Sequence, residues 1–339
     1  MSTDQLEKTV MELTTPGRGI LAADESSGTI EKRFQSVNVT STAQSRCEYR
    51  ELLFTTPGLG EFISGVILFE ETLGQQSTAG VLLPQLLVQQ GIVPGIKVDK
   101  GTVALPGFPG EKVTQGLDGL AERLAGYKKS GARFAKWRAV LAIGANTPTP
   151  QGIAANATVL ARYAAICQEQ GLVPIVEPEV LMDGDHDIET CARVTEEVQH
   201  AVFHALHQYR VVLELMLLKP NMVLPGALCP RQATPEEVAD ATLTCLRRTV
   251  PAAVPGINFL SGGLSEQAAT ANLNAMNTHP NQVPWELSFS YGRALQAPVL
   301  KAWSGMAANQ AAGQQALALR ARLNAAAREG QYTAAMEQR

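Results

Sequence analysis

The sequence predicts an α/β protein whose fold is a single (β/α)8 barrel, the TIM barrel. Short apolar runs recur along the chain, and longer segments with helical periodicity separate them. The runs do not alternate between polar and apolar residues, which is typical of strands that are buried on both faces of a parallel sheet. With 339 residues and a hydrophobic content of 45%, the chain is long enough to fill one such barrel.

The apolar runs number about eight, which is the number of strands in this barrel. In order along the chain they are GILAADE (19–25), ISGVILFE (63–70), VPGIKVD (93–99), FAKWRAVL (134–141), LVPIVEPEV (172–180), ELMLLKP (214–220), GINFLSGG (256–263) and ELSFSYGR (286–293). A doubly wound open sheet is the alternative, because it also alternates strands with helices.

Helical patterns occupy the intervals between these runs, and the clearest cover residues 116–129, 158–171, 234–250 and 307–327. In the third, Thr234 is the predicted N-cap, Pro235 takes the first helical position and Glu237 completes a capping box. No linker, repeat or low-complexity segment divides the chain. We therefore expect residues 1–339 to form one domain, with a short flexible tail from about residue 329.

The composition argues against several kinds of partner. A formal net charge of −4 shows no basic excess, so a nucleic acid is not expected to bind. Five cysteines, an odd number without a CxxC pair, indicate neither a disulfide framework nor a zinc ribbon. No apolar run approaches the ~18 residues of a membrane span, and the N-terminus lacks the apolar core of a signal peptide. We expect a soluble cytoplasmic protein without a membrane partner.

Charged and small polar residues gather where the predicted strands end. In a (β/α)8 barrel the active site lies at the carboxyl ends of the strands. The residues found there are Asp24, Lys97, Lys136, Arg138, Glu177, Glu179, Lys219, Ser261, Gly262, Gly263, Ser290, Gly292 and Arg293. Any one of them alone is more typical of a solvated strand end or a structural ion pair. The whole set indicates a functional site, because buried ions are costly and are rarely gathered without function.

Lys219 has the most unusual position in this set. It ends the apolar run ELMLLK and stands before a proline, where a lysine either extends to the surface or serves as a buried amine. Alternate residues of a strand share a face, so Lys136 points the same way as Arg138, and Glu177 the same way as Glu179.

Two glycine-containing segments predict an anion site. LSGG, after the seventh strand, offers unhindered backbone N–H groups, and SYGR, after the eighth, adds a glycine and the guanidinium of Arg293. Barrels commonly hold phosphate at this place. A second anionic end of the ligand is expected near Arg33 and the turn formed by Ser26 and Ser27, although ESSGT alone is typical of a helix N-cap.

Two other clusters carry less weight. DGDHD (183–187) resembles a metal loop, but its acidic residues are not spaced around one ion, so a solvated turn is predicted. His200, His204 and His207 recur at helical spacing without a carboxylate or cysteine partner, which is typical of one helix face. The sequence predicts no metal site, and it contains no glycine-rich nucleotide loop.

Seven motifs, spread over nearly the whole chain, have a common likeness: GILAADES, GIKVDKG, FAKWR, VEPE, LLKPNM, FLSGG and FSYGRALQ. In these motifs and in their order the sequence resembles the class I (Schiff-base) fructose-bisphosphate aldolases. The resemblance implies a TIM barrel that reversibly cleaves fructose 1,6-bisphosphate to dihydroxyacetone phosphate and glyceraldehyde 3-phosphate, in glycolysis and gluconeogenesis. It also implies a lyase that uses no metal or cofactor, binds a sugar phosphate and commonly forms a homotetramer.

The matching motifs carry the family's roles to residues of this sequence. Lys219 of LLKPNM is the implied Schiff-base former, and Glu177 of VEPE carries protons for carbinolamine formation and dehydration, with Glu179 beside it. Asp24 of AADES handles the proton of the C4 hydroxyl, and Lys136 of FAKWR supports developing charge. The residues implied in phosphate binding are Ser261, Gly262, Gly263, Ser290, Gly292 and Arg293, followed by Arg33, Lys97 and Arg138.

The chemistry of these residues agrees with the resemblance. An iminium on Lys219 is an electron sink for the carbanion that retro-aldol cleavage leaves, and carboxylates move protons on and off nitrogen and oxygen. Animal and plant members end in a mobile tail with a C-terminal tyrosine, whereas this sequence ends in GQYTAAMEQR, with Tyr332. We therefore expect Glu177 or water to protonate the enamine on Lys219.

Two other functions also fit the residues at the strand ends. In an enolase-type barrel, Glu177, Glu179 and Asp24 would bind Mg²⁺ and Lys219 would be the general base. A sugar-phosphate sensor or scaffold would use the same pocket without catalysis. The sequence leaves the preferred ketose open among fructose 1-phosphate, fructose 1,6-bisphosphate and sedoheptulose 1,7-bisphosphate.

Overall fold

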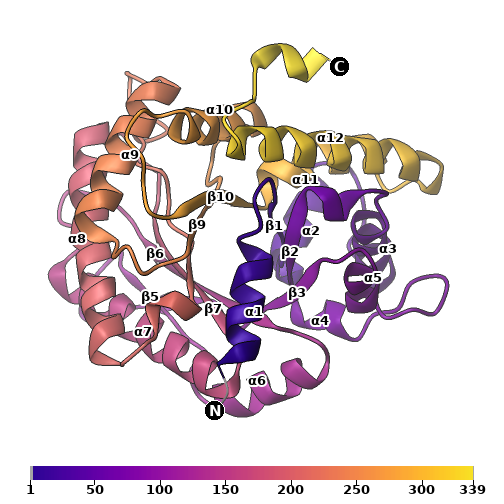
Figure 1. Cartoon of the computed structure of the whole chain (residues 1–339), viewed down its shortest axis with the longest axis horizontal. Coiled ribbons are helices and arrows are strands. Elements are labelled where there is room, and N and C mark those ends of the chain that lie inside the picture. The colour runs from indigo at the N-terminus through magenta and orange to yellow at the C-terminus, as the bar shows by residue number, and fades with distance from the viewer. Residues whose placement is uncertain (1–2, 339) are drawn as a thin grey trace.

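The computed structural model describes residues 3–338, and within them a closed barrel of eight parallel strands confirms the predicted fold (Figure 1). Around the barrel the strands follow the order β1-β10-β9-β8-β7-β6-β3-β2. Their bounds are β1 (Gly19–Ala23), β2 (Ile63–Leu68), β3 (Val93–Lys97), β6 (Phe134–Leu141), β7 (Val173–Val180), β8 (Leu217–Leu218), β9 (Gly256–Phe259) and β10 (Glu286–Tyr291).

Most strands are shorter than the predicted runs, and β8 differs most. The first part of its run forms a 3-10 helix, η2 (Leu213–Leu215), and the run ends at Pro220, which has no N–H to continue the ladder. The backbone N–H of Lys219 still donates to the carbonyl of Val176 in β7 at 2.8 Å. This hydrogen bond fixes Lys219 at the carboxyl end of the sheet.

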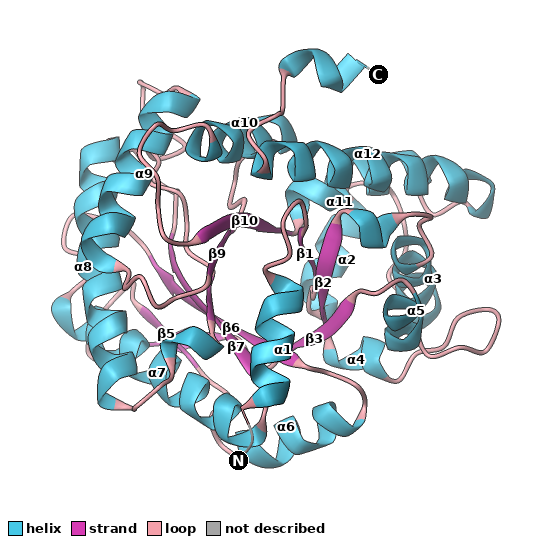
Figure 2. Ribbon diagram, in the orientation of Figure 1, coloured by secondary structure: helices cyan, strands magenta, loops and turns pink. Residues whose placement is uncertain are grey.

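Most helices surround the outside of the barrel, and α1 lies across one of its mouths (Figure 2). They are α1 (Asp4–Leu13), α2 (Ser27–Gln35), α3 (Ala43–Phe54), α4 (Glu70–Leu73), α5 (Leu83–Gln89), α6 (Leu120–Lys129), α7 (Pro150–Gln170), α8 (Ile188–Gln208), α9 (Pro235–Thr249), α10 (Glu266–Asn277), α11 (Arg293–Trp303) and α12 (Gln310–Arg328), with short 3-10 helices η1 (Leu59–Glu61), η3 (Ala307–Asn309) and η4 (Ala334–Gln338). A two-stranded antiparallel sheet, β4 (Thr102–Ala104) with β5 (Lys112–Thr114), was not predicted. Its strands have three residues each and are mostly exposed, so no apolar pattern marks them.

Capping residues in the sequence explain where two of the helices begin. At α9 the predicted capping box is present, with Thr234 as N-cap and the Glu237 side chain bonded back to it. At α7 the predicted start, residue 158, was too late. That helix begins at Pro150, because the Thr149 hydroxyl caps it by accepting a hydrogen bond from a backbone N–H in the first turn.

Two apolar clusters make up most of the core. One lies between the strands and the outer helices. The other fills the barrel interior at its amino end, where α1 lies across the mouth of the barrel (Figure 1). Its members are Leu6, Val10, Leu13, Ile20, Ala22, Ile67, Val93, Phe134, Val173, Ile175, Leu215 and Leu217. Apolar side chains therefore close the amino end, and the carboxyl end is left for polar groups.

Glycines let Phe134 fit inside this cluster. Phe134 is fully buried, and a Cβ atom on Gly95 would lie 2.3 Å from its ring. A Cβ on Gly65 would lie 3.2 Å from the same ring. Neighbouring strands thus omit side chains where the aromatic ring needs the space.

We predict that Gly95→Ala lowers the free energy of unfolding by about 1–3 kcal/mol, because the added methyl overpacks the barrel interior. Gly126→Ala on α6 is the matched control. Its Cβ would meet no atom within 4 Å, so it should leave stability unchanged or raised. Urea denaturation of the two variants measures both effects, and equal midpoints would contradict the prediction.

Candidate active site

A cavity of about 640 Å³ opens at the carboxyl ends of the barrel strands. It brings together most of the residues that the sequence analysis singled out: Asp24, Ser26, Arg33, Lys97, Lys136, Arg138, Glu177, Glu179, Lys219, Ser261, Gly262, Ser290, Gly292 and Arg293. Residues that the sequence analysis did not name also line it: Ala22, Glu25, Thr29, Lys32, Ser36 and Leu260. Segments from both ends of the chain therefore meet in one site.

Two of the singled-out residues do not line this cavity. Ser27 is the first residue of α2 and its side chain is exposed. The backbone N–H of Gly263 donates to Met182 Sδ at 3.2 Å. Each of these two residues stands next to a residue that does line the cavity, but adjacency in the sequence does not fix the direction in which a residue faces.

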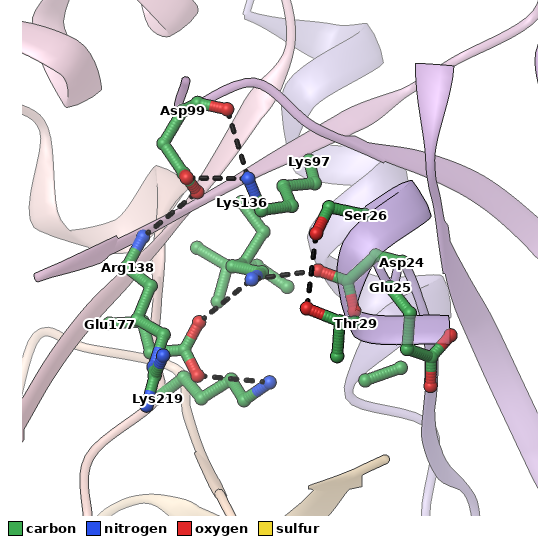
Figure 3. A network of polar contacts seen from close by, with 12 residues as sticks. Asp24, Glu25, Ser26, Thr29, Lys97, Asp99, Lys136, Arg138, Glu177 and Lys219 are labelled. Carbon is green, nitrogen blue, oxygen red and sulfur yellow. Dashed lines mark hydrogen bonds and ion pairs between the residues drawn. The ribbon is translucent and has the colours of Figure 1, made fainter. Parts of the chain in front are cut away.

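Glu177 lies at the centre of the ionic network in the cavity (Figure 3). Its Oε1 lies 3.2 Å from Lys219 Nζ, and its Oε2 lies 3.2 Å from Lys136 Nζ. Lys136 Nζ also lies 2.7 Å from Asp24 Oδ2. One carboxylate thus holds two ammonium groups, and a second carboxylate completes the chain of charges.

The strand register produces this arrangement. Lys136 on β6 is the register partner of Ile175 on β7, two residues before Glu177. Alternate residues share a face, so the side chains of Lys136 and Glu177 both point into the barrel end. Lys219 follows the last residue of β8, the next strand after β7 in the barrel. Three adjacent parallel strands therefore bring three charged groups to one point.

The charges of Asp24 and Lys136 depend on each other. Burial would raise the pKa of the Asp24 carboxyl, but the ammonium groups of Lys136 and Lys219 outweigh burial and hold this pKa well below its ordinary value. Burial would lower the pKa of Lys136, but Asp24 and Glu177 outweigh it and raise this pKa. Asp24 is thus a carboxylate and Lys136 an ammonium at neutral pH. The depressed pKa means that ionised Asp24 stabilises the fold above its ordinary pKa, and this contribution is lost as the pH falls.

Two further ion pairs extend the site away from Lys219. Arg138 Nε donates to Glu179 Oε2 at 2.5 Å, and Glu179 with other acidic neighbours outweighs burial and raises the pKa of Arg138. Lys97 Nζ lies 2.5 Å from Asp99 Oδ1. Asp99 was not predicted as a site residue, although it stands two residues after Lys97 in the same apolar run.

Glu25 is a second residue that the sequence analysis missed. It is buried and accepts hydrogen bonds from Arg33, from Arg50 Nη2 at 2.6 Å and from Gln296 Nε2 at 2.8 Å. Gln296 also donates to the carbonyl of Ala22 in β1 at 2.7 Å. Glu25 therefore fixes the guanidinium of Arg33, which lines the cavity. The partners Arg50 and Gln296 are remote in sequence, so only the adjacency of Glu25 to Asp24 hinted at a role.

The side of the cavity near β9 and β10 carries donors. Ser290 Oγ is buried and has no hydrogen-bond partner among the described residues. Arg293, at the start of α11, donates through Nη2 to the carbonyl of Gly262. Gly262 has a φ of +51°, a left-handed conformation that favours glycine. Hydroxyl, guanidinium and glycine backbone are the groups that bind an oxyanion.

The two remaining clusters from the sequence lie outside the cavity lining. Residues 183–187 connect β7 to α8, and Asp187 caps that helix by accepting from the N–H of Thr190 at 2.8 Å. The side chains of His200, His204 and His207 are exposed on α8. Among residues 3–338, no group of three or more His, Cys, Asp or Glu side chains is arranged to hold a metal ion.

A family model described as "Glycolytic: Fructose-bisphosphate aldolase class-I" matches residues 5–339. The chain belongs to the class I fructose-bisphosphate aldolase family. "Fructose-bisphosphate aldolase 5, cytosolic" of Arabidopsis thaliana is 58% identical over 97% of this chain and 92% of its own length. "Probable fructose-bisphosphate aldolase class 1" of Xanthomonas campestris is 54% identical over 98% of this chain and 99% of its own length.

A solved structure agrees with this membership of the class I aldolases. The chain superposes with a TM-score of 0.96 and 53% identity on a Plasmodium falciparum fructose-bisphosphate aldolase in complex with TRAP and a small molecule inhibitor. The match covers 98% of this chain and 96% of that one. The activity is therefore that of a class I aldolase: a lyase that cleaves fructose 1,6-bisphosphate through a Schiff base. No helix among the described residues has the length and apolar character to cross a membrane.

We predict that Lys136→Met raises the pKa of Asp24, because burial is then opposed mainly by Lys219. Titration of the ¹³C-labelled Asp24 carboxyl by NMR measures the change. Lys32→Met is the matched control, since Lys32 lines the same cavity but does not pair with Asp24. An Asp24 titration that is equal in the two variants would contradict the electrostatic account.

Proposed function

We propose that Lys219 is the Schiff-base lysine of this aldolase. The supporting observation is the position of its ammonium nitrogen, which is buried at the floor of the cavity and lies 3.2 Å from Glu177. A carboxylate at this distance can take protons from the lysine and return them to a departing hydroxyl. Amine attack on the C2 carbonyl of the ketose gives a carbinolamine, and loss of water gives the iminium that accepts the electrons of bond cleavage.

The proposal assigns a separate catalytic role to each of three residues. Glu177 and Asp24 transfer protons, and Lys136 stabilises negative charge. Glu177 delivers a proton to the carbinolamine hydroxyl as water leaves. Asp24, kept ionised by Lys136, accepts the proton of the C4 hydroxyl while the C3–C4 bond breaks. Lys136 remains a cation and stabilises negative charge that develops beside it. Glu179 contributes by pairing with Arg138 rather than by contact with Lys219.

The two phosphates of the substrate occupy opposite ends of the cavity. Ser261, Gly262, Ser290, Gly292 and Arg293 hold one phosphate, and Ser26, Arg33, Lys97 and Arg138 hold the other. The Ser290 hydroxyl, which has no hydrogen-bond partner within residues 3–338, supports the first assignment. The charge supports both, since seven cationic and four carboxylate side chains line the cavity of a chain whose net charge is −4. Excess positive charge at one point of an acidic protein fits a bisphosphate ligand.

Protonation of the enamine is assigned to Glu177 or water. Tyr332 is placed away from Lys219, because its hydroxyl donates to Glu337 at 3.0 Å and it lines a separate groove beside α9 and α10. Glu337 is in turn paired with Arg320 on α12 at 2.6 Å. In this arrangement the tyrosine packs on the outer helices.

Assembly and location complete the proposal. A homotetramer is proposed because the resemblance implies it, and the exposed apolar side chains of Tyr209 and Val212, after α8, offer surface for a subunit contact. A cytoplasmic location is proposed on the likeness to relatives named as cytosolic or cytoplasmic isozymes.

We predict that sodium borohydride with dihydroxyacetone phosphate inactivates the enzyme by reducing an imine on Lys219. Peptide mapping should find the adduct on the peptide that contains LLKPNM. Lys32→Met, which removes another lysine of the cavity, should still be labelled, whereas Lys219→Met should not. An adduct on Lys136 or Lys97 would overturn the assignment.

We predict that Arg293→Ala raises the KM for fructose 1,6-bisphosphate by about 10- to 100-fold, with a smaller effect on kcat. A charge-assisted hydrogen bond to phosphate contributes about 1.5–3 kcal/mol. Arg322→Ala, at an exposed position of α12, is the control and should leave both constants unchanged. A collapsed kcat with an unchanged KM would place the phosphate elsewhere.

A further inference from the structure

The loop after β9 holds an unusual hydrogen bond. The N–H of Gly263 donates to the thioether sulfur of Met182 at 3.2 Å. Met182 lies on the connection between β7 and α8, so the contact joins the strand that carries Glu177 to the glycine loop of the cavity. A Cβ atom on Gly263 would lie 2.8 Å from the sulfur, which shows how closely the side chain covers this amide.

Sulfur is a weak acceptor, and this amide has a better partner available in the proposed site. Gly263 follows Ser261 and Gly262, which line the phosphate side of the cavity in the proposed function, but its own N–H is turned to Met182 and Gly263 does not line the cavity. Arg293, the cation of the same site, donates to the carbonyl of Gly262. Two donors beside the phosphate position are thus bonded to neutral protein acceptors, and a charged phosphate oxygen is a stronger acceptor than either.

We propose that Met182 is a positioning residue for the phosphate site, which it controls by holding the Gly263 amide. In this proposal, which rests on the proposed function of the glycine loop, phosphate binding exchanges the sulfur for a phosphate oxygen on the Gly263 N–H. The strength of the acceptor at position 182 then sets the phosphate affinity. A weak acceptor keeps the loop ordered and is displaced at small cost.

Two substitutions of similar size separate this role from simple packing. Met182→Leu keeps the apolar volume but removes the acceptor, so it should tighten the binding of inorganic phosphate by ~2- to 5-fold. Met182→Gln places a stronger acceptor, an amide oxygen, on a side chain of similar length, so it should weaken binding by ~10-fold. The KM for fructose 1,6-bisphosphate should follow the same order, with kcat unchanged. A purely structural role would weaken binding in both variants.

NMR of the protein labelled with ¹⁵N-glycine reads the amide directly. In the wild type, inorganic phosphate should shift the Gly263 resonance, which is assigned by its loss in Gly263→Ala. In Met182→Leu the resonance should be shifted before phosphate is added. Binding that is equally tight in the Gln variant and the wild type, or weaker in the Leu variant, overturns the proposal.

The same spectra separate failure of this proposal from failure of the proposed site. If phosphate shifts Gly262 and Gly292 but leaves Gly263 in place, the role of Met182 is wrong and the phosphate site stands. If none of these amides shifts and Arg293→Ala binds phosphate as tightly as the wild type, the phosphate site itself is wrong.

Discussion

The carboxylate of Glu177, shared between the ammonium groups of Lys136 and Lys219, is the contact on which the site depends. All three side chains are buried, and isolated buried charges would be costly. Their mutual pairing, together with Asp24, makes the burial tolerable. The pairing is possible only because β6, β7 and β8 are adjacent parallel strands whose register brings the three residues together, so the closed barrel is a condition for the chemistry.

The apolar amino end of the barrel also supports the position of the charged residues. Phe134 and its neighbours fill the interior beneath the charged layer, and α1 closes the mouth. Phe134 begins β6, and Lys136 follows on the same strand face two residues later. One strand therefore supplies both the packing below and the cation above, which ties the position of Lys136 to the core. A displacement of the Phe134 ring would shift the backbone of β6 and therefore move Lys136 in the active site.

The sequence predicted the site residues whose positions follow from the barrel geometry. It did not predict the contacts that depend on loops or on helices remote in sequence. Lys219, Lys136 and Glu177 were predictable because they interrupt the apolar runs of parallel strands, although β6 and β7 continue beyond Lys136 and Glu177 to Leu141 and Val180. Glu25 was missed because two of its partners, Arg50 and Gln296, belong to helices remote in sequence, and no periodicity links them to it. The Met182 contact depends on the conformations of two separate loops, which residue types alone do not encode. The end of β8 before Pro220 could have been read from the sequence, whereas the 3-10 helix that shortens its start could not.

The cavity keeps a positive charge although several of its cationic side chains are paired with carboxylates. Glu25 is engaged by Arg33 and Arg50, and Glu179 by Arg138, so these carboxylates orient guanidinium groups without cancelling all the positive charge. Positive side chains in the lining exceed negative ones by three, seven against four. A bisphosphate carries roughly three to four negative charges at neutral pH, about 1.5–2 on each phosphate. In the proposed function the ligand therefore restores near-neutrality to the cavity, and carboxylates already hold Arg33, Lys97 and Arg138 in place for it.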